Sequence, residues 1–135
     1  MKLGRLAALV VGALAFPATA YAQPEIVSDS GDTAWILTAS AFVLMMTIPG
    51  LGLFYGGLVR AKNVLSVIMH SFVILCTVSL LWAVFGYSLV FGEGTPWLGG
   101  FGNAMLANLA DLRAGTTLPE SAFALFQMTF AIITP

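Results

Sequence analysis

Only a few residues of this chain have side chains that take part readily in chemistry. The 135 residues include one histidine, one cysteine and six acidic residues. His70 and Cys76 both lie inside a long apolar stretch, where an ionisable group is a functional candidate by default. For His70 we favour the alternative, a neutral imidazole that hydrogen-bonds across helices. Cys76 has no second cysteine with which to form a disulfide or a zinc or redox motif.

The small supply of ligating and catalytic groups excludes several classes of protein. One histidine, one cysteine and few carboxylates leave little material for a metal site or a catalytic triad, and no phosphate-binding loop is present. A net charge of −1 provides no basic field for nucleic acid. The sequence therefore predicts a protein that is not an enzyme and has no cofactor, no bound metal and no nucleic acid partner.

The composition indicates a membrane protein. Hydrophobic residues make up 59% of the chain and charged residues 8%, whereas a soluble domain carries charge on roughly a quarter of its residues. No charged residue lies between Asp32 and Arg60, or between Lys62 and Glu93. Apolar stretches of that length are typical of transmembrane helices. We therefore expect an all-α, polytopic membrane helical bundle.

Residues 1–22 are interpreted as a cleaved signal peptide. Lys2 and Arg5 provide a basic start, residues 6–16 an apolar core, and Ala20-Tyr21-Ala22 a small-x-small cleavage site. The core of about eleven residues spans only about 17 Å as a helix, against a hydrocarbon thickness of about 30 Å. An uncleaved first span is the alternative. Residues 23–32 then form an acidic mature N-terminus outside the membrane.

The first transmembrane span is predicted over residues 33–59. Pro49 and Gly50 fall inside it, and they predict a bend or a local loosening of the helix. Gly52 and Gly56 are four residues apart. This spacing indicates either a close helix–helix contact of the GxxxG type or ordinary packing.

The second span is predicted over residues 64–91. The link that precedes it carries Arg60 and Lys62, which place it in the cytoplasm by the positive-inside rule. Asn63 is a candidate N-cap for the second helix. At the outer end of this helix an aromatic belt is expected, formed by Trp82, Tyr87 and Phe91.

A glycine-rich outside loop and a third helix follow the second span. Residues 103–116 read as an interfacial helix or a folded loop, with Asp111 and Arg113 as a solvated pair. The third span is predicted over residues 118–135, with Thr117 and Glu120 as a capping box. No basic or polar anchor follows Pro135, so we expect the chain to be the N-terminal fragment of a longer protein.

Several motifs occur in series along the two predicted spans. They are MTIPGLGLFYGGLVR over residues 46–60, KNVLS over 62–66, GYSL over 86–89 and FGEG over 91–94, followed by Phe126-Gln127. Together they closely resemble the N-terminal part of the ammonium transporter family, over most of residues 33–135. The signature positions present, interpreted as structural, are Pro49, Gly50, Phe54, Tyr55, Gly56, Gly57, Arg60 and Asn63.

The resemblance implies a membrane transporter or channel for ammonium and ammonia that serves nitrogen uptake. Members of this family have about eleven transmembrane helices in two inverted repeats, and they assemble as homotrimers with one pore in each subunit. The resemblance further implies the inner membrane of a bacterium, a periplasmic N-terminus and a PII-class signal protein on the cytoplasmic face. This chain corresponds to the first two or three of those helices.

Phe126 and Phe130 are the predicted substrate residues. By the family pattern they resemble the aromatic side chains of the outer vestibule and gate, and their spacing places them on one helix face. An aromatic face attracts a cation by roughly 0.5–2 kcal/mol. Without the resemblance, the stripe formed with Phe123 would read as packing. Gln127 is either a pore acceptor or a helix–helix hydrogen bond, and the pore histidines of the family belong to later helices than the one carrying His70.

A structural role is the alternative to transport. In that case the chain is a small membrane subunit that oligomerises through its glycine-rich helix. A stop codon directly after Pro135 would favour this alternative, and further apolar spans would favour the transporter.

Overall fold

The computed structural model of the protein describes residues 27–135. The predicted signal peptide and the first residues of the predicted mature N-terminus lie outside the described residues. The described part is helical apart from one small hairpin and its flanking loop, which confirms the predicted all-α class.

A continuous helical rod over Ser30–Leu58 opens the described chain. It consists of α2 (Ser30–Met45), the π-helical turn η1 (Met46–Leu51) and α3 (Gly52–Leu58). The helix begins three residues before the predicted span because the Asp29 carboxylate accepts hydrogen bonds from the Gly31 and Asp32 amides at 2.6 and 3.0 Å. Pro49 lies inside η1, which confirms the loosening expected there.

The second rod turns back along the first after two residues of extended backbone. It consists of the short 3₁₀ turn η2 (Ala61–Asn63), α4 (Val64–Leu81), a second π-helical turn η3 (Trp82–Gly86) and α5 (Tyr87–Phe91). Asn63 occupies the cap position of α4, but its side chain makes no capping hydrogen bond, so the capping part of that prediction is wrong. A Cβ at the buried Gly56 would lie 3.5 Å from Val64 Cγ1, so this glycine provides the close contact between the rods.

The segment between α5 and α6 is a folded loop and not an interfacial helix. Strands β1 (Gly94–Thr95) and β2 (Leu98–Gly99) pair antiparallel, and the 3₁₀ turn η4 (Ala104–Leu106) follows. The hydroxyl of the buried Ser88 fastens this loop to α5. It donates to the Gly100 carbonyl at 2.6 Å and accepts from the Asn103 amide at 3.0 Å.

The last helix, α6 (Glu120–Ile133), begins two residues later than predicted. Pro119 is in the cap position and no side chain caps the helix, so the predicted capping box is wrong. The two residues of that box are engaged elsewhere. Thr117 Oγ1 donates to the Asp32 carboxylate of α2, and the Glu120 carboxylate accepts from Arg113 and Tyr87.

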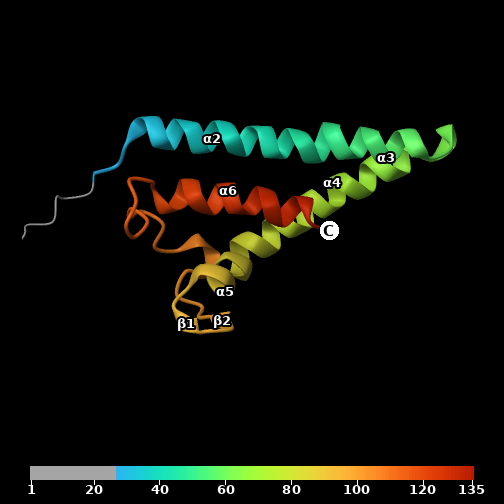
Figure 1. The fold of residues 1–135 in the computed structure, drawn as a ribbon. Helices are drawn as coiled ribbons and strands as arrows, with labels where there is room; N and C mark the ends of the chain where they lie inside the picture. The colour runs from blue at the N-terminus through green and yellow to red at the C-terminus, as the bar shows by residue number, and fades with distance from the viewer. Residues whose placement is uncertain (1–26) are drawn as a thin grey trace, which may run out of the picture.

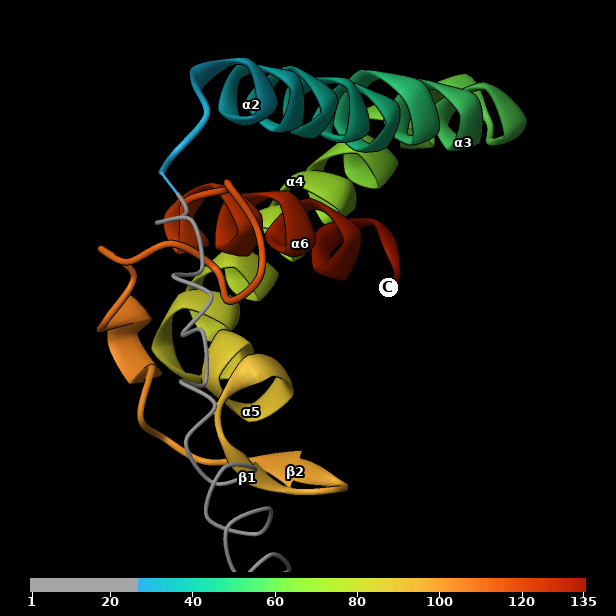
Figure 2. The same ribbon diagram turned by 60° about the vertical axis from the view of Figure 1, so that its left-hand side comes forward.

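The two rods form the arms of a V, and α6 lies between them (Figure 1). α6 packs along α2 and also contacts α4, and the turned view shows α4 running obliquely to both (Figure 2). The buried positions are mostly small. Ser40 and Thr47 are seven residues apart on the first rod, and Ala122 and Thr129 are seven apart on α6. Small residues at a helix–helix interface allow the backbones of membrane helices to approach closely.

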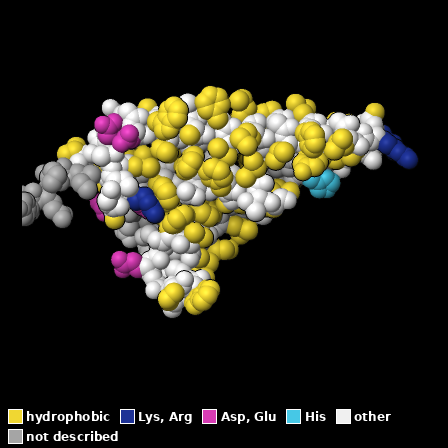
Figure 3. Space-filling model, viewed as in Figure 1, with side chains coloured by type: hydrophobic (Ala, Val, Ile, Leu, Met, Phe, Trp, Pro, Cys, Tyr) yellow, Lys and Arg dark blue, Asp and Glu magenta, His cyan; other side chains and the backbone are white. Residues whose placement is uncertain are grey.

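The surface of the two rods is largely apolar, and charge is confined to their ends (Figure 3). Both rods are long and apolar enough to cross a membrane. At the hairpin end, here called the basic end, lie Arg60 and Lys62. The opposite end is here called the acidic end. It carries one cation, Arg113, and every acidic residue of the described chain, namely Asp29, Asp32, Glu93, Asp111 and Glu120.

Candidate functional site

Phe126 and Phe130 form a contacting pair on one face of α6. Their ring centroids lie 5.0 Å apart with an interplanar angle of 83°, an edge-to-face arrangement. Phe126 is half-buried, and Phe130 is 43% exposed within the described chain. The structure therefore places together the two residues predicted to recognise substrate, with part of the Phe130 ring accessible.

Two threonine hydroxyls are hydrogen-bonded to the α6 backbone beside this aromatic pair. Thr129 Oγ1 donates to the Phe126 carbonyl at 2.6 Å, and Thr134 Oγ1 donates to the Phe130 carbonyl at 2.8 Å. The Thr129 side chain is fully buried. Gln127 lies between the two phenylalanines in sequence and is half-buried. Its two alternative roles, pore acceptor and helix–helix hydrogen bond, stay predictions.

Trp82 fixes the middle of α6 against the second rod. Its indole Nε1 donates to the Ala124 carbonyl at 3.2 Å, two residues before Phe126. The Trp82 ring also meets Tyr87 and Phe91 edge-on, with centroids 6.0 and 6.3 Å away. The tryptophan therefore positions the aromatic pair relative to α4 and α5.

A charged pair fixes the first turn of α6. Arg113 Nη1 lies 3.0 Å from Glu120 Oε1, and the two side chains are 30% and 17% exposed. The hydroxyl of Tyr87, a residue with no exposed surface, donates to the same carboxylate oxygen. The backbone repeats the link, because the Arg113 amide donates to the Leu118 carbonyl at 2.9 Å and the Glu120 amide to the Asp111 carbonyl at 3.0 Å.

Arg113 also stacks on aromatic rings. Its guanidinium carbon lies 3.6 Å from the Phe123 centroid and 5.3 Å from the Phe91 centroid. The predicted solvated pair of Asp111 and Arg113 is therefore wrong, because Glu120 and two aromatic faces hold the guanidinium. Tyr87 is buried in this cluster, so within the described chain it does not belong to a lipid-facing aromatic belt.

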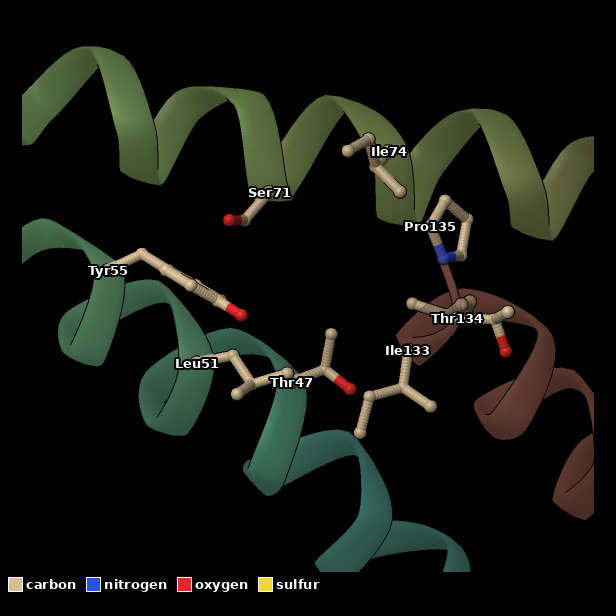
Figure 4. Close-up of a pocket in the computed structure, with 9 residues that line it drawn as sticks. Thr47, Leu51, Tyr55, Ser71, Ile74, Ile133, Thr134 and Pro135 are labelled. Carbon is tan, nitrogen blue, oxygen red and sulfur yellow. The ribbon is translucent and has the colours of Figure 1, made fainter.

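A cavity of about 220 Å³ lies between the rods and the last turn of α6 (Figure 4). Thr47, Leu51 and Tyr55 line it from the first rod, and Ser71 and Ile74 from α4. Thr134, four residues beyond Phe130 and directly after α6, also lines it. The cavity thus lies at the C-terminal end of the helix that carries the aromatic pair, and neither Phe126 nor Phe130 lines it.

Two hydroxyl groups of this cavity are arranged as acceptors. Thr47 and Ser71 donate to the Val43 and Val67 carbonyls of their own helices, both at 3.3 Å. A hydroxyl that donates its only proton keeps its lone pairs for another donor. The cavity therefore offers oxygen acceptors to a small molecule with N–H groups, in otherwise apolar surroundings.

The remaining predicted residues lie in the first rod and the turn after it. Pro49 and Gly50 are in η1, and Tyr55 reaches the cavity. His70 is exposed, and among residues 27–135 no hydrogen bond holds its imidazole, so the predicted cross-helix bond is absent from this part of the protein. The other signature residues lie toward the basic end, away from the aromatic pair: Phe54, Gly56, Gly57, Arg60 and Asn63.

The network of Arg113, Glu120 and Tyr87 was not predicted from the sequence. The available signal was a single cation, seven residues before a carboxylate, in a segment that is otherwise mildly apolar. Because Asp111 is the carboxylate nearest to Arg113 in sequence, the two were predicted to form a pair. The aromatic residues at the ends of the neighbouring helices were the better indication of where it lies.

Comparison with known proteins identifies the chain. The model of the Ammonium Transporter Family matches residues 34–135. A relative from Methanothermobacter thermautotrophicus is 49% identical over 109 residues, which cover 78% of this chain and 27% of the relative. The ammonium transporter of Mycobacterium tuberculosis strain H37Rv is 46% identical over 126 residues (80% and 26%), and that of Bacillus subtilis 45% over 106 residues (77% and 26%).

The chain spans about a quarter of the length of these curated relatives. The match nevertheless includes the first rod from residue 34 on, the whole of the second rod, the loop between α5 and α6, and the whole of α6. With its two long apolar helices and its third helix packed between them, the chain belongs to the ammonium transporter family.

Proposed function

We propose that this protein transports ammonium or ammonia across a membrane, with Phe126 and Phe130 as part of an aromatic gate. The observation that carries the proposal is the edge-to-face pair on α6, at 5.0 Å between centroids, in a chain that belongs to the ammonium transporter family. Relatives named as ammonium transporters support the same substrate. Transport and not catalysis is the proposed activity.

Weak attraction suits an aromatic gate. A cation over a phenyl face gains roughly 0.5–2 kcal/mol, enough to favour entry of ammonium without holding it tightly. Tight binding would slow passage, since conduction needs sites that release their ligand. The partly exposed ring of Phe130 offers such a face, and the half-buried ring of Phe126 supports it from one helical turn away.

Selection of ammonium over alkali cations needs a second device, because aromatic faces attract both. Acceptors for N–H bonds, or loss of a proton before an apolar passage, would discriminate between them. The acceptor hydroxyls of Thr47 and Ser71 line a cavity that begins beyond the pair. We therefore propose that the ion is recognised at the aromatic pair and that neutral ammonia passes on along the apolar helix faces.

The charge distribution supports an orientation in the membrane. Arg60 and Lys62 at the basic end favour the cytoplasm, which leaves the acidic end and the aromatic pair on the outer side. By the same proposal the protein lies in the inner membrane of a bacterium, with a cleaved signal peptide and a periplasmic N-terminus. A homotrimer and a PII-class partner on the cytoplasmic face are proposed from the family.

The structural-subunit alternative is not favoured. Its main support was the glycine-rich helix as a surface for oligomerisation. Gly52 and Gly56 are buried within this chain, and the site of a Cβ at Gly56 faces Val64 and Ile68 of the neighbouring helix. Gly56 therefore already serves packing inside the chain.

Uptake of radiolabelled methylammonium tests the proposal. The gene product, expressed at full length in a host without ammonium transporters of its own, is expected to take up label at a saturable rate, and unlabelled ammonium should compete. The same host with an empty vector is the control. Uptake no faster than this control, with the protein present in the membrane fraction, would refute transport.

A further inference from the structure

The charged pair at the start of α6 lies close to the proposed gate. Glu120 is six residues before Phe126 on the same helix, about 9 Å along its axis. The Arg113 guanidinium stacks on Phe123. Phe123 lies three residues before Phe126, about one helical turn closer to Phe126 than Glu120 is. Along the helix axis, these opposite unit charges therefore lie about 9 Å from Phe126 and about 15 Å from Phe130.

This pair differs from the other charges of the acidic end in its burial. Asp29, Asp32, Glu93 and Asp111 are exposed, so water and salt screen their fields. Arg113 and Glu120 are 30% and 17% exposed, and their surroundings are the rings of Phe91 and Phe123 together with the Tyr87 hydroxyl. A net charge left on either partner would therefore act on a nearby cation with little screening.

We propose that Arg113 and Glu120 are positioning and specificity-determining residues that hold the entrance to the aromatic gate electrically neutral. Glu120 cancels the repulsion that Arg113 would exert on ammonium. Arg113 cancels the attraction that Glu120 would exert on every cation. The inference rests on the proposed function, and it assigns these two residues a role beyond joining the loop to α6.

The size of the expected effect follows from the separation. An uncompensated charge on the pair and a cation at Phe126, about 10 Å apart, interact weakly at the permittivity of water and four times more strongly at an effective permittivity of about 20. The corresponding change in cation affinity is roughly 2-fold at the lower limit and roughly 15-fold at the upper limit. Cation affinity should fall where Arg113 keeps its charge alone and rise where Glu120 keeps its charge alone. Damage to the fold would instead impair transport in both cases.

Four variants of the full-length protein test the proposal by methylammonium uptake. Glu120→Gln keeps the acceptor for Tyr87 and leaves Arg113 uncompensated, so KM should rise at least about 2-fold. Arg113→Gln leaves Glu120 uncompensated, so KM should fall by a similar factor. The double variant Arg113→Gln/Glu120→Gln and the charge-conserving Arg113→Lys should both return KM to near the wild-type value.

The readout separates charge from folding. KM does not depend on the amount of transporter in the membrane, so a loss of folded protein lowers only the maximal rate. Raising the ionic strength should reduce the difference in KM between the two single variants. Shifts of the same sign, unchanged KM in both, or a double variant no closer to wild type than either single would overturn the proposal. Absence of uptake by the wild type would instead refute the proposed function.

Discussion

Ser88 is expected to be among the most sensitive small polar residues of the described chain. Its side chain is fully buried in α5, donates to the Gly100 carbonyl at 2.6 Å and accepts from the Asn103 amide at 3.0 Å. One hydroxyl therefore satisfies two backbone groups of the loop that leads to α6. Ser88→Ala removes both hydrogen bonds and leaves both loop groups without that partner.

The magnitude follows from the two groups left behind. A buried backbone group that loses its partner costs about 1–3 kcal/mol. Because Gly100 and Asn103 are partly exposed, water can compensate in part, and we expect a total near the lower half of the sum, about 2–4 kcal/mol. At roughly 2 °C per kcal/mol for a larger protein, the apparent Tm should fall by about 4–8 °C.

The matched control is Ser79→Ala, the same substitution on the same rod. Ser79 donates only to the Leu75 carbonyl of its own helix, at 2.7 Å, and such back-bonding contributes little to helix stability. Scanning fluorimetry of the purified full-length variants in detergent gives both values under one condition. Equal Tm values for Ser88→Ala and Ser79→Ala would show that the Ser88 hydroxyl does not hold the loop.

Three other substitutions test separate parts of the structure. Phe130→Ala should raise KM for methylammonium by roughly 2- to 30-fold through loss of the aromatic face. The control is Phe42→Ala, at an exposed phenylalanine of α2, which should leave KM unchanged. Equal KM values for the two variants would return Phe130 to a packing role. Trp82→Phe should cost about 1 kcal/mol of stability, because the donor to the Ala124 carbonyl is lost. Trp97→Phe, at a residue that is 95% exposed, should cost nothing measurable, and the same fluorimetry measures both variants. Gly99→Ala should open the hairpin and speed proteolysis of residues 92–103, because the new Cβ would lie 2.5 Å from the Ser88 carbonyl oxygen. The control is Gly102→Ala, whose Cβ would have no atom within 4 Å. Equal cleavage rates for the two variants would contradict the clash.

Local chemistry explains which parts of the fold were predictable. The two rods follow from uninterrupted apolar stretches between charges, and the first π-helical turn follows from Pro49, whose ring cannot continue the α-helical hydrogen bonding. The second π-helical turn, at Trp82–Gly86, contains no proline. It coincides with the indole bond to α6 and the burial of Tyr87, which are contacts with distant residues and leave no local pattern.

The start of α6 shows how tertiary contacts overrode a local motif. Thr117 and Glu120 have the spacing of a capping box, but in the structure Thr117 is bonded to Asp32 and Glu120 to Arg113 and Tyr87. A charged partner offers the carboxylate a stronger hydrogen bond than a backbone amide does. The candidate gate was predictable in part: the spacing of Phe126 and Phe130 placed them on one face, whereas the residues that hold this face come from elsewhere in the sequence.

The contacts between Thr117 and the start of α2 have a consequence for biosynthesis. The Asp29 amide donates to the Thr117 carbonyl at 3.1 Å, and Thr117 lies 85 residues after its second partner, Asp32. At about 5–20 residues per second, a ribosome takes roughly 4–17 s to make that intervening chain. Throughout this interval the start of α2 lacks its Thr117 contacts, and after the second rod has been made Tyr87 still lacks the carboxylate of Glu120. Assembly of the acidic end is therefore a late step of synthesis, and a translational pause before Glu120 would prolong the time in which the two rods lack α6.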